Sequence, residues 1–487
     1  MRLIVPPAGM RRYIQRAAAL IALGLPLAGC TVGPNYVRPP ADVPPAYKEA
    51  ASPGFENAQP SDALAKGKWW EIYGDSQLNS LEEQVTVSNQ SLRAAQAQFA
   101  QARAAVQVAR AAYYPTVSGS GSASRTRQSQ NGPLFGASSP INYNDFQLPI
   151  DASWEPDVWG RVRRTVEAAR SEAQASAADL ANVDLSLHAE LALDYFELRG
   201  LDSQKKLLDS TVVSYEKALE LTNSRFTGGI ASAVDVAQAQ TQLETTRAQD
   251  EDVDVQRTAF EHAIAVLIGK PPADFSQMPT PLTAPPPPVP ASLPSELLER
   301  RPDIAAAERR VQEANAQIGV ARSAYYPQFT LTGDGGFESS RLGTLLQGPA
   351  GFWALAGSAA ELIFDGGERH GMTAEARAGY DESVDNYRQT TLSAFEDVED
   401  NLAALRILQG EARTQDAAVA AAEHSLDLSI TRYKGGVANY LEVTTAQSAA
   451  LSDERAAVDI LTRRMAASVL LIKAVGGGWN VSQIPSM

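Results

Sequence analysis

The most constraining feature of this sequence is an internal repeat. The segment SRFTGGIASAVDVAQAQ at 224–240 matches TRYKGGVANYLEVTTAQ at 431–447 with an offset of 207 positions. Upstream, ARAAYYPTVSGSGS at 109–122 matches ARSAYYPQFTLTGD at 321–334 with an offset of 212 positions. Because a repeated sequence folds into a repeated structure, each element predicted in one half is expected to have a counterpart in the other.

Each half of the chain reads as a helix, two strands, a very long helix and a further helix. The first unit spans residues 71–278 and the second residues 295–476. The connector between them, residues 279–294, is rich in proline, which fits neither a helix interior nor a central strand, so it is expected to run extended. The remaining predicted segments are a signal peptide at 1–29, an extended N-terminal segment at 30–70 and a C-terminal tail at 477–487.

The first thirty residues predict export and lipid attachment. Four arginines precede an apolar run from Ala17 to Leu27, which is too short for a membrane helix and is typical of a signal peptide. The run ends in LAGC, which resembles the bacterial lipobox, where the cysteine is acylated and becomes the first mature residue. Cys30 is the only cysteine, which excludes an internal disulfide and a cysteine metal cluster. We therefore expect a lipid anchor on Cys30, and the absence of aspartate after it resembles outer-membrane sorting.

Alternating apolar and polar residues predict strands with one apolar and one wet face. In DFQLPIDASWE at 145–155, every second residue is apolar. The segment Gln328–Glu338 repeats this pattern, and weaker examples lie at Thr116–Arg125 and Phe352–Phe364. No later segment offers about 18 consecutive apolar residues, so any membrane crossing is expected to use strands. The polar positions predicted to face a water-filled lumen are Gln147, Asp151, Ser153, Glu155, Gln328, Thr330, Thr332 and Asp334.

Four strands cannot close a membrane barrel by themselves. The smallest membrane barrels have about eight strands, and an open edge would leave backbone groups unpaired in lipid. The chain is therefore expected to contribute its strands to an oligomer. Two copies would give about eight strands around a filled interior, whereas three would give about 12 and begin to leave a lumen. Physical reasoning alone leaves both arrangements open.

Two very long helices are predicted at about Asp157–Phe226 and Gly367–Tyr433. At 1.5 Å per residue, helices of about 70 residues form rods of roughly 100 Å, which no compact globule contains. Mostly apolar and small residues recur at steps of four and three from Leu201 to Phe226 and from Leu408 to Tyr433, the spacing of left-handed coiled coils. The second seam is rich in Ala and Gln, which favours helices side by side in a larger curved wall. A plain two-stranded coiled coil is the alternative.

Charge and motif content exclude several classes of function. The formal net charge of −15 argues against nucleic-acid binding. The sequence has no GxSxG, HExxH or phosphate-binding loop, and its four histidines fall at no ligand spacing. We therefore predict no enzyme, no metal and no cofactor other than the covalent lipid. The rival hypotheses are a periplasmic hydrolase and a lipid-anchored coiled-coil tether without a pore. The tether does not explain the alternation of apolar and polar residues at 145–155.

Several motifs resemble the TolC-like outer-membrane factors, specifically their OprM/NodT-type lipoprotein branch. They are PSELLERRPDIAAAE at 294–308, GPNYVRPP at 33–40, WWEIYGDSQL at 69–78, the two YYP sites, the two R(F/Y)xxGG turns and GGGW at 476–479. The resemblance implies a mixed α and β membrane protein. It would be a homotrimer whose 12-stranded outer-membrane β-barrel, with four strands per chain, is continuous with a long periplasmic α-helical barrel.

In function, the resemblance implies the exit duct of a tripartite efflux pump for small molecules. The duct would sit in outer-membrane lipid, extend into the periplasm and dock to a periplasmic adaptor protein and an inner-membrane transporter, expected to be of the RND type. A type I protein-secretion channel is the alternative within this family.

The resemblance also assigns gate and docking residues. In the family, an apolar residue and, one helical turn later, an aspartate face the pore after the second tip. Here these positions are Leu441 and Thr445, and Thr445 departs from the acidic pattern. Glu442 and Asp235, which correspond in the repeat, are alternative sources of acidity, although Asp235 also reads as an exposed helix charge. The glycine turns are expected to form periplasmic tips that meet adaptor hairpins, through Arg225, Gly228, Gly229, Arg432, Gly435 and Gly436.

Overall fold

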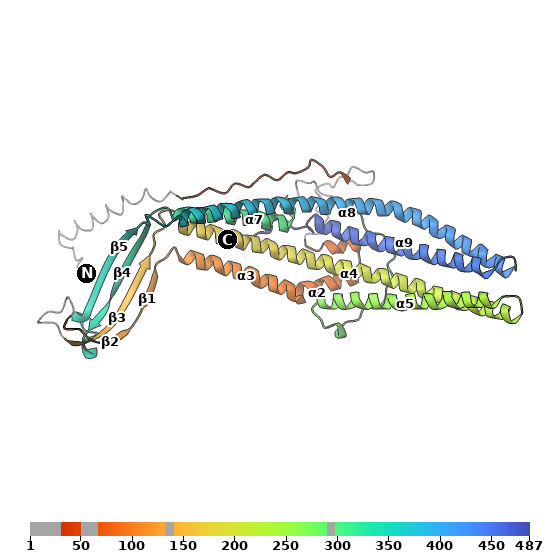
Figure 1. Cartoon of the computed structure of the whole chain (residues 1–487), viewed down its shortest axis with the longest axis horizontal. Helices are drawn as coiled ribbons and strands as arrows, with labels where there is room; N and C mark the ends of the chain where they lie inside the picture. The colour runs from red at the N-terminus through yellow and green to blue at the C-terminus, as the bar shows by residue number, and fades with distance from the viewer. Residues whose placement is uncertain (1–30, 50–66, 132–140, 290–297) are drawn as a thin grey trace, which may run out of the picture.

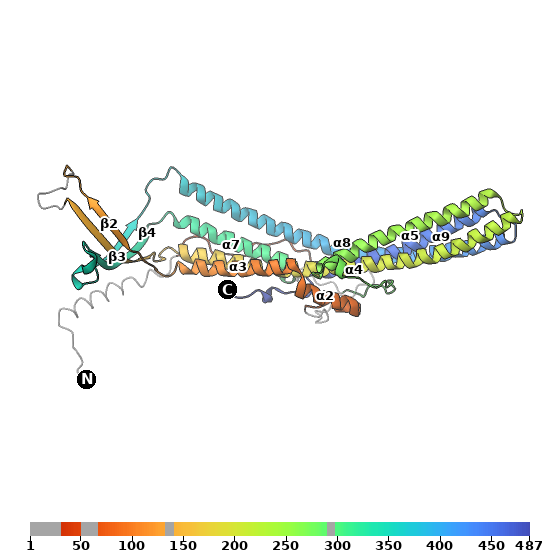
Figure 2. The same ribbon diagram turned by 90° about the horizontal axis from the view of Figure 1, so that it is seen from below.

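The computed structural model describes residues 31–49, 67–131, 141–289 and 298–487. The molecule is elongated, with an antiparallel sheet at one end and long helices running away from it (Figures 1 and 2). Two helical hairpins end together at the end opposite the sheet, where the glycine turns were predicted. The predicted signal peptide and Cys30 lie outside the described residues.

The sheet has four strand positions, in agreement with the alternation in the sequence. In spatial order, β1 and β2 lie beside β3, which is followed by β4 and β5, and all neighbours are antiparallel. The sheet therefore has one edge made by β1 and β2 and another made by β5. The strands are β1 (Thr116–Gly119), β2 (Ser122–Arg127), β3 (Asn142–Trp154), β4 (Gln328–Ser339) and β5 (Gly351–Ala360).

A proline explains why the first predicted strand is divided into β1 and β2. Both pair with β3 in one continuous register. Between them, Ser120 donates its backbone N–H to the carbonyl of Pro149, but Pro149 has no N–H to return the bond. The missing ladder bond interrupts the strand without shifting its register.

Two other strand ends differ from the sequence prediction. β3 begins at Asn142 rather than Phe146, because β2 continues to pair with it that far. β5 ends at Ala360 rather than Phe364. Its partner strand β4 begins directly after Pro327, and proline cannot extend the ladder further. These differences lie at the ends and leave the predicted faces unchanged.

The register places the alternating residues on two separate faces. Residues directly opposite each other in a sheet share a face. On one face, Leu148 lies opposite Phe337 and Trp154 opposite Leu331. The other face carries the polar positions from both strands, paired as Gln147 with Glu338, Asp151 with Asp334, and Ser153 with Thr332.

The helical part is built on two helices of equal length, α4 (Arg161–Thr227) and α8 (Glu368–Lys434), each of 67 residues. α4 starts four residues later than predicted, at Arg161, and its N-cap is Gly160. The Asp157 carboxylate accepts the backbone N–H groups of Val162 and Arg163. The other helices are η3 (Trp69–Tyr73), α2 (Ser76–Ser88), α3 (Gln90–Ala111), α5 (Ala233–Leu267), η4 (Pro272–Asp274), α7 (Pro302–Ser323), η5 (Leu342–Thr344), η6 (Gly348–Ala350), α9 (Tyr440–Ala474) and η7 (Val481–Gln483).

None of the helices in the described part of the chain is both long and apolar enough to cross a membrane.

Each part of the rod is a single layer of adjacent helices. Near the sheet, α3 contacts α4, α4 contacts α7, and α7 contacts α8. Towards the tips, α5 contacts α4, α4 contacts α9, and α9 contacts α8, with a smaller contact between α5 and α9. The layer therefore has α3 and α5 at one edge and α8 at the other. The sheet has the same order, with β1 and β2 at the first edge and β5 at the second.

The largest core cluster lies midway along the rod. It joins the Trp69 and Trp70 indoles of η3 to Tyr195 and Phe196 of α4 and to the C-terminal turns of α9. The Arg301 guanidinium donates to Asp303 and Asp397 where α7 begins at Pro302. The middle of the rod is thus fixed within the single chain.

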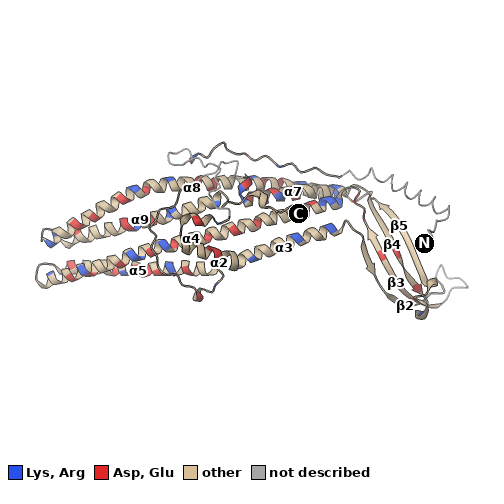
Figure 3. Ribbon diagram, turned by 180° about the vertical axis from the view of Figure 1, so that it is seen from behind, with Lys and Arg blue, Asp and Glu red and all other residues tan. Residues whose placement is uncertain are grey.

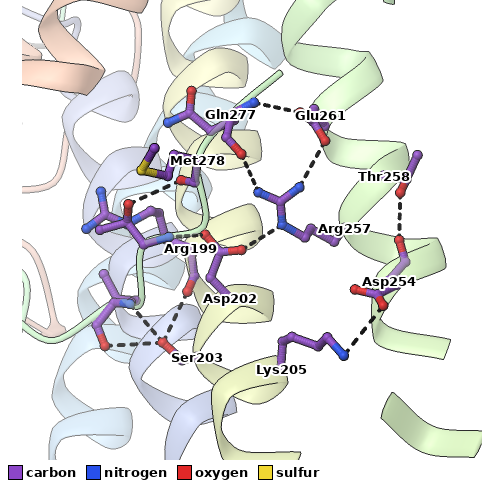
Figure 4. A network of polar contacts seen from close by, with 12 residues as sticks. Arg199, Asp202, Ser203, Lys205, Asp254, Arg257, Thr258, Glu261, Gln277 and Met278 are labelled. Carbon is purple, nitrogen blue, oxygen red and sulfur yellow. Dashed lines mark hydrogen bonds and ion pairs between the residues drawn. The ribbon is translucent and has the colours of Figure 1, made fainter. Parts of the chain in front are cut away.

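The start of the connector is held to the rod by a polar network that sequence reasoning missed. Figure 4 shows the Arg257 side chain of α5 between Asp202 of α4 and the backbone carbonyl of Gln277. The Asp202 carboxylate is buried and also accepts the backbone N–H of Thr280 at 2.7 Å. Side chains of the first unit therefore satisfy backbone groups that an extended chain cannot pair internally.

Candidate functional site

The two helical tips share one turn geometry, which the glycine pairs make possible. At the first tip, Ile230 donates its N–H to the carbonyl of Arg225, and Gly229 donates to Phe226. This is a Schellman turn, and its left-handed position is Gly229, with φ of 73°. Gly228 is right-handed and helical. The second tip repeats this pattern, with Gly436 left-handed and Gly435 helical. Only the second glycine of each pair is required by the backbone.

The two predicted gate positions lie on one exposed face of α9. Leu441 is 54% exposed, although the preceding Tyr440 is buried. Thr445 is also exposed, and its hydroxyl donates to the Leu441 carbonyl at 2.8 Å. That bond satisfies the hydroxyl within the helix, so Leu441 presents the apolar surface at this level and Thr445 presents a methyl group beside it.

The two tip carboxylates serve as helix-end partners. Asp235 and Ser232 form a capping box, in which each side chain accepts the backbone N–H of the other. Glu442 occupies the equivalent position on α9, and its carboxylate lies 3.7 Å from the guanidinium of Arg432. The local structure thus accounts for both charges, and Asp235 has a more specific structural role than an exposed helix charge.

The tips are joined to each other by a contact that the sequence did not predict. The Arg225 guanidinium lies over the ring of Tyr433, 4.6 Å from its centroid, and donates to the Lys434 carbonyl at 3.2 Å. Tyr433 also packs edge to face against Tyr440. Arg225 therefore links the end of α4 to the end of α8 through a cation–π contact and a hydrogen bond. The sequence gives one signal for this contact, a difference between the two repeats: the position of Tyr433 in the second half is occupied by Phe226 in the first.

The polar face of the sheet places carboxylates next to each other. Asp151 of β3 lies directly opposite Asp334 of β4. Like charges directly opposite each other are destabilising unless water screens them. At the helix end of the same face, Gln328 donates to the Glu155 carboxylate at 2.8 Å, and Arg161 forms a bidentate pair with that carboxylate. This face is therefore suited to bulk water, whereas the face with Trp154 and Leu331 is suited to an apolar medium.

A buried charged pair lies in the middle of the rod. The His188 imidazole of α4 and the Glu82 carboxylate of α2 are 2.6 Å apart, and both are buried. Burial alone would lower the pKa of His188, but interactions with Asp184 and Glu82 outweigh it and raise that pKa to about 9. Burial raises the pKa of Glu82 to about 7, against the opposing effect of His188. The Trp70 ring stacks on His188 with centroids 4.4 Å apart. These residues fix α2 to α4.

Comparison with known proteins agrees with this architecture. Residues 81–270 and 293–477 match the outer membrane efflux protein family, one stretch in each half of the repeat. The chain is 32% identical over 456 residues to the probable efflux pump outer membrane protein TtgC of Pseudomonas putida, which covers 93% of each chain. It is 31% identical over 477 residues to the outer membrane protein OprJ of Pseudomonas aeruginosa, which covers 97% of each chain.

A solved structure has the same fold over almost the whole length. The CmeC outer membrane channel of Campylobacter jejuni matches with a TM-score of 0.88 and 26% identity, over 93% of this chain and 96% of CmeC. These matches confirm the predicted fold and the prediction of a channel rather than an enzyme. The chain belongs to the outer membrane efflux protein family.

Proposed function

We propose that three copies of this chain form a duct through which a pump expels small molecules across the outer membrane. Each copy supplies four of 12 strands to a barrel in the membrane and one third of a helical tunnel in the periplasm. Relatives are named for antibiotic and toluene efflux, which supports small, partly apolar compounds as the cargo. Driving energy comes from partners, because a passive duct with no reaction centre supplies none.

One observation carries this proposal. Two helices of the chain make a close contact, and the repeat-equivalent positions of that contact lie exposed at the two edges of the chain. Gly200 of α4 packs against Thr462 of α9, so closely that a Cβ on Gly200 would lie 2.3 Å from the Thr462 hydroxyl. The repeat offset of 207 positions relates Gly200 to Ile407 of α8, and Val255 of α5 to Thr462. Ile407 and Val255 are 55% and 69% exposed, at opposite edges of the chain.

In a closed ring, α8 of one copy would lie beside α5 of the next copy. Ile407 and Val255 would then meet as Gly200 and Thr462 do within the chain. The sheet closes in the same sense, since β5 and the first strand position of the next copy would be antiparallel. A ring in which unlike edges meet is a head-to-tail assembly, and three copies close it with enough strands to leave a lumen.

Cross-linking tests this assembly. A chain with both Val255→Cys and Ile407→Cys is expected to form disulfide-linked dimers and trimers on oxidation, because the two cysteines lie on different copies. Each single variant is the control and is expected to stay monomeric in denaturing gels. Cross-links confined within one chain, or none in a lipid-embedded sample, would contradict the ring.

The N-terminal anchor is a further part of the proposal. Acylation of Cys30 would attach each chain to the periplasmic leaflet, next to the helix ends that join the sheet. The described segment begins one residue later and is held there, because Val32 donates its N–H to the Trp159 carbonyl. Mass analysis of the N-terminal peptide is expected to show the lipid on wild-type protein, and Cys30→Ser is expected to lose it.

The tip residues provide the gate. In a ring of three, the exposed Leu441 side chains would converge on the axis, where an apolar constriction can exclude water. Neighbouring tip surfaces, including Arg225, Arg432 and the two glycine turns, are expected to receive a periplasmic adaptor that opens the ring. The inner-membrane transporter, of the RND type by this proposal, would then load the duct.

Single-channel conductance tests the gate. Leu441→Ala is expected to raise the open probability of the purified protein in planar bilayers, because a smaller side chain no longer excludes water. Val437→Ala is the matched control, since Val437 is 70% exposed in the turn before α9 and is not assigned to the constriction. If Leu441→Ala behaves like Val437→Ala, the gate assignment is wrong, while the duct itself is still measured by its conductance.

A further inference from the structure

The strongest unassigned feature is an open cleft where the helices meet the sheet. Its volume is about 680 Å³, within the range of small-ligand sites. Arg322 and Tyr326 line it from the end of α7, and His370 and Arg377 line it from the start of α8. The N-terminal segment, beginning at Thr31, forms a third wall.

The wall made by the N-terminal segment is held by close backbone contacts. A Cβ on Gly160 would lie 2.4 Å from the Thr31 methyl group, and a Cβ on Gly33 would lie 2.5 Å from the Gly319 Cα. The two glycines therefore let the segment lie directly on α4 and α7. The Tyr326 ring is fixed as well, because it stacks on Trp159 with centroids 4.9 Å apart. The cleft is thus a built site rather than a gap between loose side chains.

The cleft has positive charge that the described chain does not neutralise. None of the described residues lining it is acidic. Neighbouring arginines are paired, such as Arg164 with Glu167 and Arg369 with Asp365. In contrast, Arg322 and Arg377 form no ion pair with any carboxylate among the described residues. Figure 3 shows other basic residues on the helix turns beside the sheet, in the same zone as the cleft.

The position of the cleft indicates the ligand. Thr31 directly follows the proposed acylated Cys30, so the cleft lies at the level where the anchor enters the membrane. Tyr326 is two residues before β4, the start of the membrane sheet. Both landmarks place the cleft in the headgroup layer of the periplasmic leaflet, where phosphate groups are abundant. Guanidinium groups bind phosphate oxygens bidentately, and a tyrosine at this depth suits a membrane interface.

We propose that this cleft binds the phosphate headgroup of an anionic phospholipid from the periplasmic leaflet. The bound lipid would lie beside the acyl chains of Cys30 and join α7, α8 and the N-terminal segment. Each trimer would hold three such lipids. This inference rests on the proposed membrane placement and on the anchor at Cys30.

Lipid retention tests the site. The trimer is reconstituted in nanodiscs of phosphatidylethanolamine and phosphatidylglycerol, extracted into detergent and examined by native mass spectrometry. Wild type is expected to retain phosphatidylglycerol, and Arg322→Gln with Arg377→Gln is expected to retain at least tenfold less. The charge-matched control combines Arg93→Gln and Arg413→Gln, exposed positions farther along the rod, and is expected to behave like wild type. Equal retention by the cleft variant and wild type, or equal loss in the control, would overturn the site.

Two further measurements separate this inference from the proposed function. Bilayer conductance of the cleft variant shows whether the duct still assembles. A variant that conducts and retains as much lipid as wild type contradicts the lipid site but not the duct. A wild-type protein that never conducts contradicts the proposed function instead. Cys30→Ser is expected to keep the bound phosphatidylglycerol, since the phosphate and not the anchor holds it. Release of the lipid by millimolar inorganic phosphate would instead identify a free-phosphate site and overturn the assignment to a lipid.

Discussion

α4 and α8 have the same length and equivalent positions in the repeat, but they are buried to different extents. Of the 67 residues in each helix, 22 are buried in α4 and 10 in α8. Among the described helices, α4 packs against α3 and α5 on one side and α7 and α9 on the other, whereas α8 packs against α7 and α9 only. The N-terminal segment adds hydrogen bonds to α8, such as the pair between Glu49 and Arg406. The chain thus surrounds α4 with its own helices, and in the proposed ring a second copy would complete the surroundings of α8.

The side chains at repeat-equivalent positions of α4 and α8 reflect this difference in burial. At position 200 of α4 the residue is glycine, because α9 passes too close for a Cβ. At the equivalent position of α8 it is Ile407, whose side chain is 55% exposed. The glycine thus lies at an interface within the chain, and in the proposed ring the exposed isoleucine would lie at an interface with the next copy.

The largest expected effect comes from charging the open edge of α8. Ile407→Asp would bury an unpaired carboxylate in every interface of the ring, at a cost of more than about 3 kcal/mol each. The trimer is expected to be lost in detergent, while the helical content of the chain, measured by circular dichroism, is kept. Gln409→Asp, two positions away and also exposed, is the control. A stable Ile407→Asp trimer, seen by native gel and mass photometry, would show that α8 has no partner at this position.

The second effect lies inside the chain. Gly200→Ala would force α4 and α9 apart and is expected to destabilise the protein by about 1–3 kcal/mol. At Gly410 of α8, no side chain or other segment of the described residues lies within 4 Å of a new Cβ, so Gly410→Ala is expected to stabilise the helix by about 0.5–1 kcal/mol. Thermal unfolding followed at 222 nm compares the two variants. A destabilising Gly410→Ala would show that another copy approaches α8 there as closely as α9 approaches Gly200.

Much of the fold could be predicted from the sequence because its patterns are long and regular. A long helical pattern, with coiled-coil spacing in its C-terminal part, located both long helices to within a few residues of each end. Period-two alternation located the strand faces, since a register shift would have exposed every apolar residue to the wrong medium. The ends were less well predicted. They depend on single residues such as Asp157, whose carboxylate accepts backbone N–H groups of the first turn of α4, and Pro149, which interrupts a ladder that the pattern treats as continuous.

The candidate site was predicted less completely, because its contacts join residues far apart in the chain. Leu441 was assigned through family resemblance, and its exposure agrees with a pore-facing position without testing it. The Arg225 contact with Tyr433 spans two halves of the repeat, and no local pattern encodes such a pair. The same holds for Asp202 and Arg257, which hold the connector. Where the two halves differ at an equivalent position, as at Phe226 and Tyr433, the sequence does carry a usable signal.

The third effect concerns the two tip arginines, which correspond in the repeat but have different partners. Arg225→Ala removes the cation–π contact and the hydrogen bond that join the two hairpins. The loss weakens the attachment of the hairpins by about 1 kcal/mol or more per copy. The tips are expected to separate more readily, so the open probability in planar bilayers should rise. Arg432→Ala removes only an exposed pair with Glu442 and is expected to change it little. If both substitutions open the pore equally, charge at the tip and not the contact with Tyr433 controls the gate.

The smallest expected effect is on the pH dependence of stability at His188. Its repeat counterpart, Phe395, is buried and carries no charge. The folded pKa of His188, about 9, lies above its ordinary value of 6.5. Its contribution to stability is therefore complete below pH 6.5 and is lost as the pH rises through 9. The raised pKa of Glu82 acts in the same direction at lower pH, between 4.5 and about 7.

Between pH 6.5 and 9.5 the wild-type unfolding temperature is thus expected to fall by several degrees. His188→Gln is expected to be less stable at pH 6.5 but to show a flatter profile, because glutamine keeps a hydrogen-bonding group beside Glu82 without a titrating charge. His262→Gln, at an exposed position, is expected to follow wild type. A wild-type profile as flat as that of His188→Gln would mean that the imidazole is neutral in the fold. The polar pair between α2 and α4 would then act as an ordinary hydrogen bond, and the first repeat would stabilise this position without charge, as the second does through Phe395.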